Sequence, residues 1–253
     1  MPQSAAPKSV HVNGDGSTLE PFDLARCLTV MSDEERSTLR AAGAEVLNCQ
    51  RILKKTSSNV VSEILRHQGS YYEWSHYPKG DAVDWETHSL YYYHSHPKEE
   101  RPDEHGHFHT FLCYDGMPDD VAPLPLTVPQ AENDSRVGAH IVAISMDKRG
   151  RASKLFTVNR WVTDETWYPA DAMKRMIDRF EMDHAFPSWA TNRWLSAMMI
   201  LFKPQIAYLL DARDAVVADW AARHPDTDAF EDRGLEVAAE LDIDVGEQVA
   251  ALG

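Results

Sequence analysis

The sequence lacks several features on which common protein classes depend. Its 253 residues include three cysteines, Cys27, Cys49 and Cys113, which are far apart and form no C-x-x-C pair. This spacing excludes the usual thiolate zinc frameworks and iron–sulfur motifs, and unpaired cysteines suit a reducing compartment. We find no apolar run of about 18 residues, no glycine-rich phosphate loop and no signal-peptide pattern. We therefore expect a soluble, cytoplasmic protein.

Positive charge is also scarce. The chain has 25 Lys and Arg against 40 Asp and Glu, for a formal net charge of -15. A surplus of negative charge opposes binding to a phosphate backbone, so we expect neither a nucleic-acid nor a membrane partner. With 43% hydrophobic residues the chain can bury a substantial core. These quantities favour one globular domain, and we expect a small-molecule substrate as its partner.

Histidine, in contrast, is concentrated in one place. Five of the twelve histidines fall within the sixteen residues from His94 to His109. They recur at every second position, and residues i and i+2 of an extended strand point to the same face. The flanking segments 90–93 and 108–114 are rich in aromatic and β-favouring residues. The pattern therefore predicts two strands, with His94 and His96 on one face of the first and His105, His107 and His109 on one face of the second.

The segment between these strands, residues 97–104, is charged, contains two prolines and predicts a hairpin loop. Antiparallel pairing with His96 opposite His105 places His94 opposite His107 and Tyr92 opposite His109. Opposed Cβ atoms lie about 4.5–5.5 Å apart, close enough for several imidazoles to reach one ion. We therefore predict a histidine-rich metal site on a β-hairpin.

Imidazole-rich ligation indicates the kind of metal. Nitrogen donors suit iron, copper, zinc or nickel and disfavour calcium and magnesium, which require oxygen ligands. We favour iron or copper, with zinc as the alternative, and leave haem open. A proton-handling or anion site, or a structural role, are the other interpretations of the cluster. His140, on a predicted strand, is the best ligand from outside it, whereas Cys113 is better explained as a small buried apolar residue.

Two family resemblances arise from these motifs. The pattern His94-x-His96-x-x-x-Glu100, followed by Gly106, resembles the first metal motif of the cupin superfamily, which implies a small β-barrel holding iron, manganese, copper or zinc. This sequence departs from the cupin pattern in two ways: residues 97–104 are predicted to form a loop, and no second cupin motif follows. The run from Glu104 to His109, with segments 159–162 and 186–189, resembles an uncharacterised bacterial protein family over most of the chain.

The remaining pattern predicts an α+β fold. We expect a disordered segment 1–20 and one domain 21–253, with helices in 21–69, the histidine-bearing β-region in 70–165 and mainly helices in 166–253. The domain has a central antiparallel sheet or a small cupin-like barrel, flanked by helices at both ends of the chain. A capping box at Ser32–Glu35 begins the first long helix, and a helix over 59–67 follows. The expected strands are 70–77, 89–96, 105–114, 137–146 and 153–163, with 235–245 as an edge strand. The expected C-terminal helices are 170–182, 190–202 and 204–223.

These observations favour a metal-dependent enzyme, with an iron or copper oxidoreductase ahead of a zinc hydrolase or lyase. Glu104 and Tyr92 are the candidate catalytic residues beside the metal. A non-catalytic protein that buffers, delivers or senses metal is the competing class, and an interaction module with a histidine pH switch is a third. Oligomeric state stays open, including a homodimer. Two Arg-Trp pairs are candidate substrate-binding residues by stacking and bidentate hydrogen bonds: Arg160, Trp161, Arg193 and Trp194.

Overall fold

The computed structural model describes residues 10–12, 20–128 and 138–253. In chain order, the described elements are β1 (Val10–Val12), α1 (Leu24–Val30), α2 (Asp33–Lys54), α3 (Val60–Leu65), β2 (Tyr77–Asp84), β3 (Ser89–His94), β4 (Glu104–Cys113), η1 (Tyr114–Gly116), β5 (Gly138–Asp147), β6 (Ala152–Val158), α4 (Arg160–Thr163), α5 (Ala170–Met176), η2 (Ile177–Arg179), α6 (Trp189–Leu201), α7 (Lys203–Arg223), β7 (Val237–Asp242) and α8 (Val245–Leu252).

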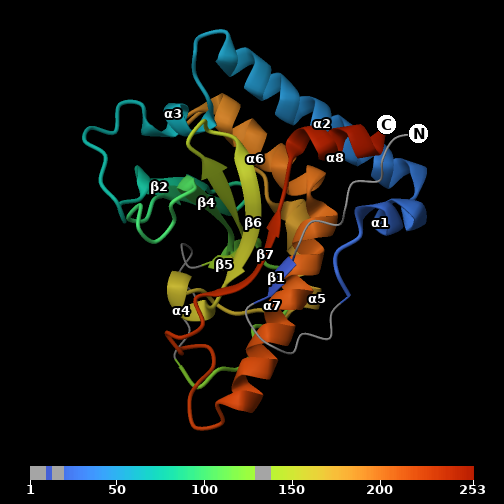
Figure 1. Ribbon diagram of the computed structural model, residues 1–253, viewed down its shortest axis with the longest axis vertical. Helices are drawn as coiled ribbons and strands as arrows, with labels where there is room; N and C mark the ends of the chain where they lie inside the picture. The colour runs from blue at the N-terminus through green and yellow to red at the C-terminus, as the bar shows by residue number, and fades with distance from the viewer. Residues whose placement is uncertain (1–9, 13–19, 129–137) are drawn as a thin grey trace.

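The centre of the molecule is an antiparallel sheet (Figure 1). In the described part of the chain it has seven strands in the order β1-β7-β6-β5-β4-β3-β2. The consecutive strands β2 to β6 pair as neighbours, and β7 returns from the C-terminal region to pair with β6 and β1. Because β1 and β2 lie at opposite edges, this order is that of an open sheet. This confirms the predicted α+β fold with a central antiparallel sheet. The alternative, a small cupin-like barrel, is not what the structure shows.

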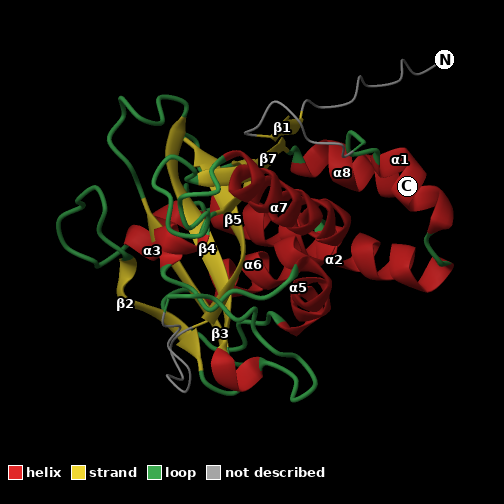
Figure 2. Cartoon of the chain, turned by 90° about the horizontal axis from the view of Figure 1, so that it is seen from below, coloured by secondary structure: helices red, strands yellow, loops and turns green. Residues whose placement is uncertain are grey.

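The helices α2, α5, α6 and α7 lie on one side of this sheet (Figure 2). On β4, Phe108, Thr110 and Leu112 point toward them, with Phe108 packed on Trp194 of α6 and the Thr110 hydroxyl contacting the Met199 sulfur. These β4 side chains are buried completely. Since β-strand side chains alternate, His107 and His109 point to the opposite side, away from the helical layer.

Helix boundaries follow the sequence signals closely. Ser32 and Glu35 form the predicted capping box, which is worth about 1 kcal/mol of helix stability. Asn59 caps α3, and Pro204 lies in the first turn of α7, as expected. The buried side chains of α2 recur at helical spacing and face α6 and α8, which is the amphipathic pattern of a helix packed on a core: Leu39, Ala42, Val46, Cys49 and Leu53.

Several elements differ from expectation. The helix expected over 170–182 is α5 followed by the 3-10 helix η2, and it ends at Arg179. The strand expected over 70–77 is wrong: β2 covers Tyr77–Asp84, where we expected no strand beyond Tyr77. Its register against β3 shifts between Tyr77 and Ala82, where Gly80 and Asp81 have left-handed backbone angles. The last part of the strand expected over 153–163 is helix α4, capped by Asn159. Residues 10–12 form β1 against β7, although we expected this segment to be disordered, and β7 is therefore covered by β1. The rest of residues 1–19 lies outside the described part of the chain.

Among the described residues, no single helix combines the length and apolar composition needed to cross a membrane. Helices α6 and α7 reach that length and composition only as a pair, and the pair is bent by 70° where they meet.

Candidate metal centre

The hairpin of β3 and β4 carries the histidines. Two of the three predicted pairs are present, because His94 pairs with His107 and Tyr92 pairs with His109. The predicted pair of His96 with His105 is not formed, because β3 ends at His94 and His96 lies in the loop. The connecting loop covers residues 95–103, with a turn closed by backbone hydrogen bonds from Glu100 and Arg101 to the Pro97 carbonyl. His94, His107 and His109 are buried, and His96 is only partly accessible. The hairpin thus places several imidazoles on the side of the sheet away from the helical layer.

A β-bulge at the start of β4 changes one prediction. The register of β4 against β5 shifts between Glu104 and Gly106, so the strict alternation fails there. His105 turns to the opposite face, where its Nδ1 lies 2.6 Å from the Tyr93 hydroxyl. The expectation that His105 shares a face with His107 and His109 is therefore wrong. Glu104 takes its place beside His107.

Gly106 is required by this close packing. A Cβ atom at this position would lie 2.4 Å from the His94 carbonyl oxygen and 2.5 Å from the Tyr93 hydroxyl oxygen. Both distances are far below van der Waals contact, and one partner is backbone that cannot move aside. Only glycine lets the bulge approach β3 while His94 and His107 stay opposite each other.

Three histidines form the candidate centre: His94, His96 and His107. One ring nitrogen from each lies within 4.8 Å of the others. The Nε2 atoms of His94 and His107 are 2.7 Å apart, and the His96 ring centroid lies 5.2 Å from each of the other two. Two nitrogens bound tetrahedrally at about 2.0–2.1 Å from zinc are roughly 3.3 Å apart. Small movements of the rings would therefore place one ion among the three. The protein thus contains a buried histidine cluster that could hold a metal ion.

Acidic side chains lie behind two of these rings. The Nδ1 of His107 is 2.5 Å from a Glu104 carboxylate oxygen, and the Nδ1 of His96 is 3.1 Å from Glu100. Glu104 in turn accepts a hydrogen bond from the Ser145 hydroxyl at 2.6 Å and pairs with Arg101. A carboxylate on one nitrogen of a ligand histidine fixes the ring and leaves the other nitrogen for the metal. Glu104, a candidate catalytic residue, is therefore in an orienting position.

A second histidine pair adjoins this group. The Nδ1 of His109 lies 3.0 Å from the Nε2 of His140, and the His109 ring centroid is 4.8 Å from that of His107. His140 reaches this face because a second register shift, between Thr110 and Phe111, places it opposite Phe111. Its backbone N–H donates to the buried carboxylate of Glu165 at 2.8 Å. The structure thus brings His140 to the cluster, although the strand does not alternate regularly as we expected.

Burial keeps these imidazoles neutral. It lowers the pKa of His94 to about 2 and that of His140 to about 3, and the positive charges of Arg101 and Arg213 add to the effect at His94 and His140, respectively. Burial also lowers the pKa of His107 and of His109. Burial alone would raise the pKa of Glu104, but its hydrogen bonds with His107 and Ser145 and the Arg101 charge outweigh this and lower it. An ionised Glu104 accepts the Nδ1 proton of His107, so the Nε2 lone pair faces His94.

The surroundings include residues that the sequence did not single out. The His76 ring stacks on Tyr92 at 3.7 Å and lies 5.7 Å from the His94 ring, with its Nδ1 3.0 Å from Asp81. Trp74 lies over His96, with ring centroids 4.0 Å apart. Tyr77 pairs with Tyr93, and this pairing places the adjacent residue His76 beside His94. The sequence pattern does not reveal this contact, because the irregular strand after His76 hides the pairing of Tyr77 with Tyr93.

Tyr92, the other catalytic candidate, is buried among rings. It lies 5.6 Å from the His94 ring and 5.1 Å from the His109 ring, and burial raises the pKa of its hydroxyl. Cys113 is buried on the same face in an apolar cluster with Leu90, Tyr92 and Phe111. Tyr92 therefore borders the candidate centre, whereas Cys113 packs in the apolar cluster beside it.

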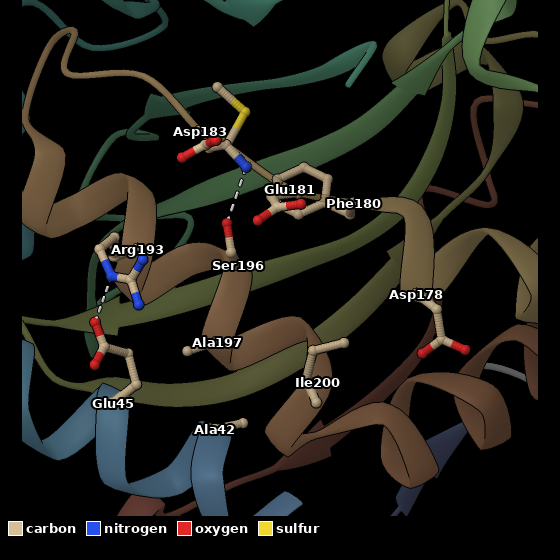
Figure 3. Close-up of a pocket in the computed structure, with 11 residues that line it drawn as sticks. Ala42, Glu45, Asp178, Phe180, Glu181, Asp183, Arg193, Ser196, Ala197 and Ile200 are labelled. Carbon is tan, nitrogen blue, oxygen red and sulfur yellow. Dashed lines mark hydrogen bonds and ion pairs between the residues drawn. The ribbon is translucent and has the colours of Figure 1, made fainter. Parts of the chain in front are cut away.

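The two Arg-Trp pairs do not form one pocket. Arg160 pairs with Glu231 and Asp164, and the Trp161 indole N–H donates to the Leu235 carbonyl. Trp194 is buried in the helical core. Arg193 pairs with Glu45 of α2 at 2.6 Å and lines an open groove of about 310 Å³ between α2 and α6 (Figure 3). This groove lies on the helical side of the sheet, away from the histidines.

The fold and this geometry define a mixed α+β protein with a buried histidine cluster able to hold a metal ion. The chain belongs to the family described as domain of unknown function DUF6969, whose sequence pattern matches residues 40–243. This confirms the resemblance to an uncharacterised family. Comparison with curated proteins and with solved structures gives no match.

Proposed function

We propose that the protein is a metal-dependent enzyme in which His94, His96 and His107 bind one transition-metal ion. The observation that carries this proposal is the convergence of three ring nitrogens within 4.8 Å, from β3, β4 and the loop between them. Carboxylates behind His96 and His107 support it, since this arrangement typically orients metal-binding histidines.

The donor set fits iron, copper, zinc or nickel. Two of the three imidazoles are unprotonated at neutral pH, because burial lowers the pKa of His94 and of His107. A metal ion needs unprotonated nitrogen ligands, so no large protonation cost opposes binding. Iron or copper is our first assignment and zinc the second. A haem among these rings is not favoured, because a porphyrin needs a flat slot and side chains already fill the space around His107 and His109.

Three protein ligands favour catalysis over storage. Structural metal sites are usually closed by four protein ligands, whereas catalytic sites keep one position for water or substrate. His96 is the one residue of the three in the intermediate burial range, and its side chain is 8% exposed. The set of three ligands supports an enzyme with a small-molecule substrate over a protein that only buffers or delivers metal.

The residues around the centre have separate tasks in this proposal. Glu104, held by Ser145 and Arg101, orients His107 and retains the Nδ1 proton of that ring. Tyr92 and Phe156 exclude water from the sheet side, since they pack on the His94, His107 and His109 rings. When bound, an iron or copper ion would supply redox chemistry at this site. A zinc hydrolase or lyase is the second candidate, because three histidines with an open position also suit catalytic zinc.

The test is whether the bound metal keeps an exchangeable position. Metal-free protein is loaded with Co²⁺ or Cu²⁺, and azide or imidazole is titrated while the absorption spectrum is recorded. We expect a saturable spectral change in the wild type and its loss in His96→Asn. His67→Asn is the matched control, because His67 is an exposed histidine with a left-handed backbone that asparagine tolerates. A metal that binds tightly but accepts no added ligand would contradict an enzyme and favour storage.

A further inference from the structure

Trp74 has an unusual position beside the candidate centre. The residue is 54% exposed, although a large apolar side chain gains stability from burial. Its backbone has φ 65°, the left-handed region that bulky residues rarely adopt. A residue that is both strained and exposed contributes little to folding. His67 is also exposed and has the same backbone conformation, so what distinguishes Trp74 is its contact with the His96 ring.

The backbone holds this residue in place. The Trp74 N–H donates to the carbonyl of Ser95, the residue between His94 and His96, at 2.9 Å. Nearby, the Tyr72 N–H donates to the Tyr77 hydroxyl at 2.7 Å, which fixes the loop to the start of β2. The indole is thus attached to the same stretch of chain that supplies two of the proposed ligands.

Two aromatic side chains, Trp74 and His76, lie beside the candidate centre. The Trp74 ring lies 4.0 Å from the His96 ring and 6.3 Å from that of His94, at 80° to the latter. The His76 ring, kept parallel to Tyr92 by stacking, lies 5.7 Å from His94 at 81°. Both rings therefore meet His94 nearly at right angles. Of the three proposed ligands, His96 is the least buried and lies under the indole.

We propose that Trp74 binds the aromatic ring of a small-molecule substrate while a nitrogen or oxygen atom of that molecule occupies the open position on the metal. This inference rests on the proposed function and names its substrate class. A flat ring stacks favourably on an exposed indole beside a coordination site. The nearby cation, Arg101, is already engaged by Glu104 and Glu236. The substrate is therefore a neutral or cationic aromatic compound.

The experiment compares two probes that share one coordinating group. Imidazole and 4-phenylimidazole are titrated into Co²⁺-loaded protein, and dissociation constants are taken from the absorption change. Stacking of the phenyl ring should make 4-phenylimidazole bind about two- to tenfold more tightly than imidazole in the wild type. In Trp74→Asn, which keeps a residue tolerant of the left-handed backbone, this preference should disappear while imidazole binds as before.

Trp85→Ala is the matched control. Trp85 is 56% exposed but lies in the turn between β2 and β3, at the end of the hairpin away from His94. Its replacement should leave the preference unchanged. If Co²⁺ binds and imidazole binds but the phenyl group adds no affinity, or its advantage survives Trp74→Asn, the substrate assignment is overturned and the metal site stands. If no metal is taken up, neither probe changes the spectrum, and both proposals are overturned.

Discussion

The Nδ1 atom of His107 lies 2.5 Å from Oε1 of Glu104, three residues earlier on the same strand. In a regular strand these two side chains would point to opposite faces, and the bulge at Gly106 is what turns them together. A carboxylate in this position sets both the orientation of the ring and which nitrogen keeps the proton.

Replacement of Glu104 by glutamine should therefore weaken metal binding without removing a ligand. Glutamine keeps the size of the side chain but not its charge, so His107 is held less firmly and its Nε2 is less basic. We expect a loss of about 10- to 100-fold in affinity for Zn²⁺ or Cu²⁺, measured by competition with a chromophoric chelator. The carboxylate of Glu100 is far more exposed, so Glu100→Gln should reduce metal affinity much less. Equal losses in the two variants would argue against an orienting role for Glu104.

Gly106→Ala should damage both the fold and the site. The added Cβ would collide with the His94 carbonyl and the Tyr93 hydroxyl, so the hairpin must shift where the ligands meet. We expect a loss of about 1–3 kcal/mol in the free energy of unfolding, together with weaker metal binding. Gly246→Ala is the control, because its Cβ would meet only the Asp244 side chain, at 3.1 Å. Wild-type stability in Gly106→Ala, measured by urea unfolding, would show that the bulge is not constrained in this way.

His105 and His107 should behave differently despite being two residues apart. His105 bonds to Tyr93 on the other face of the sheet, whereas His107 belongs to the proposed ligand set. His105→Ala should retain metal stoichiometry, and His107→Ala should lose it, as measured by elemental analysis after dialysis. Circular dichroism establishes that both variants are folded. Loss of metal in His105→Ala with a native spectrum would place His105 among the ligands after all.

The metal-free protein should lose stability in mild acid. In the unfolded chain imidazole binds a proton below about pH 6.5, whereas the folded pKa values of His94 and His140 are about 2 and about 3, and that of His109 is also well below the ordinary value. The unfolded state therefore binds more protons than the folded state below pH 6.5. Each of these histidines lowers the free energy of unfolding by about 1.4 kcal/mol for every pH unit of acidification.

Glu165 acts in the opposite direction. Burial raises its pKa to about 7, so between about pH 7 and pH 4.5 the folded state holds a proton that the unfolded state lacks, and stability rises as the pH falls. The effect of three histidines exceeds that of one carboxyl group. Urea unfolding should therefore show that the free energy of unfolding falls by roughly 2–3 kcal/mol as the pH is lowered from about 6 to about 5. The fall should be steeper in Glu165→Gln. A flat profile over this range would mean that the histidines are not buried as described.

Local signals were sufficient to predict much of this structure. The alternating histidines from His94 to His109, with a proline-containing loop between them, predicted the hairpin and its pairing at His94–His107 and Tyr92–His109, but not the loss of the His96–His105 pair. Ser32 and Glu35 marked the start of α2, since capping depends on neighbours in sequence. The α+β class followed from the same local patterns.

The parts that were missed depend on contacts between distant segments. The bulge that turns His105 away arises from close packing of Gly106 on β3, which the alternating pattern conceals. His76 reaches the site only because Tyr77 pairs with Tyr93 across an irregular strand. Arg160 and Arg193 belong to separate ion pairs with Glu231 and Glu45, and their partners lie 71 and 148 residues away. Sequence proximity to a tryptophan gave no information about those partners.

The most direct test of the central claim is X-ray absorption spectroscopy on protein loaded with Fe²⁺, Cu²⁺ or Zn²⁺, combined with elemental analysis of the dialysed sample. The account predicts one metal ion per chain, with about three imidazole nitrogens near 2.0–2.1 Å in the zinc form and one further light-atom ligand. The same measurement on His94→Gln should show at least one imidazole fewer or no retained metal. Protein that retains none of the three metals, or that binds one with an unchanged shell in His94→Gln, would contradict the proposed centre.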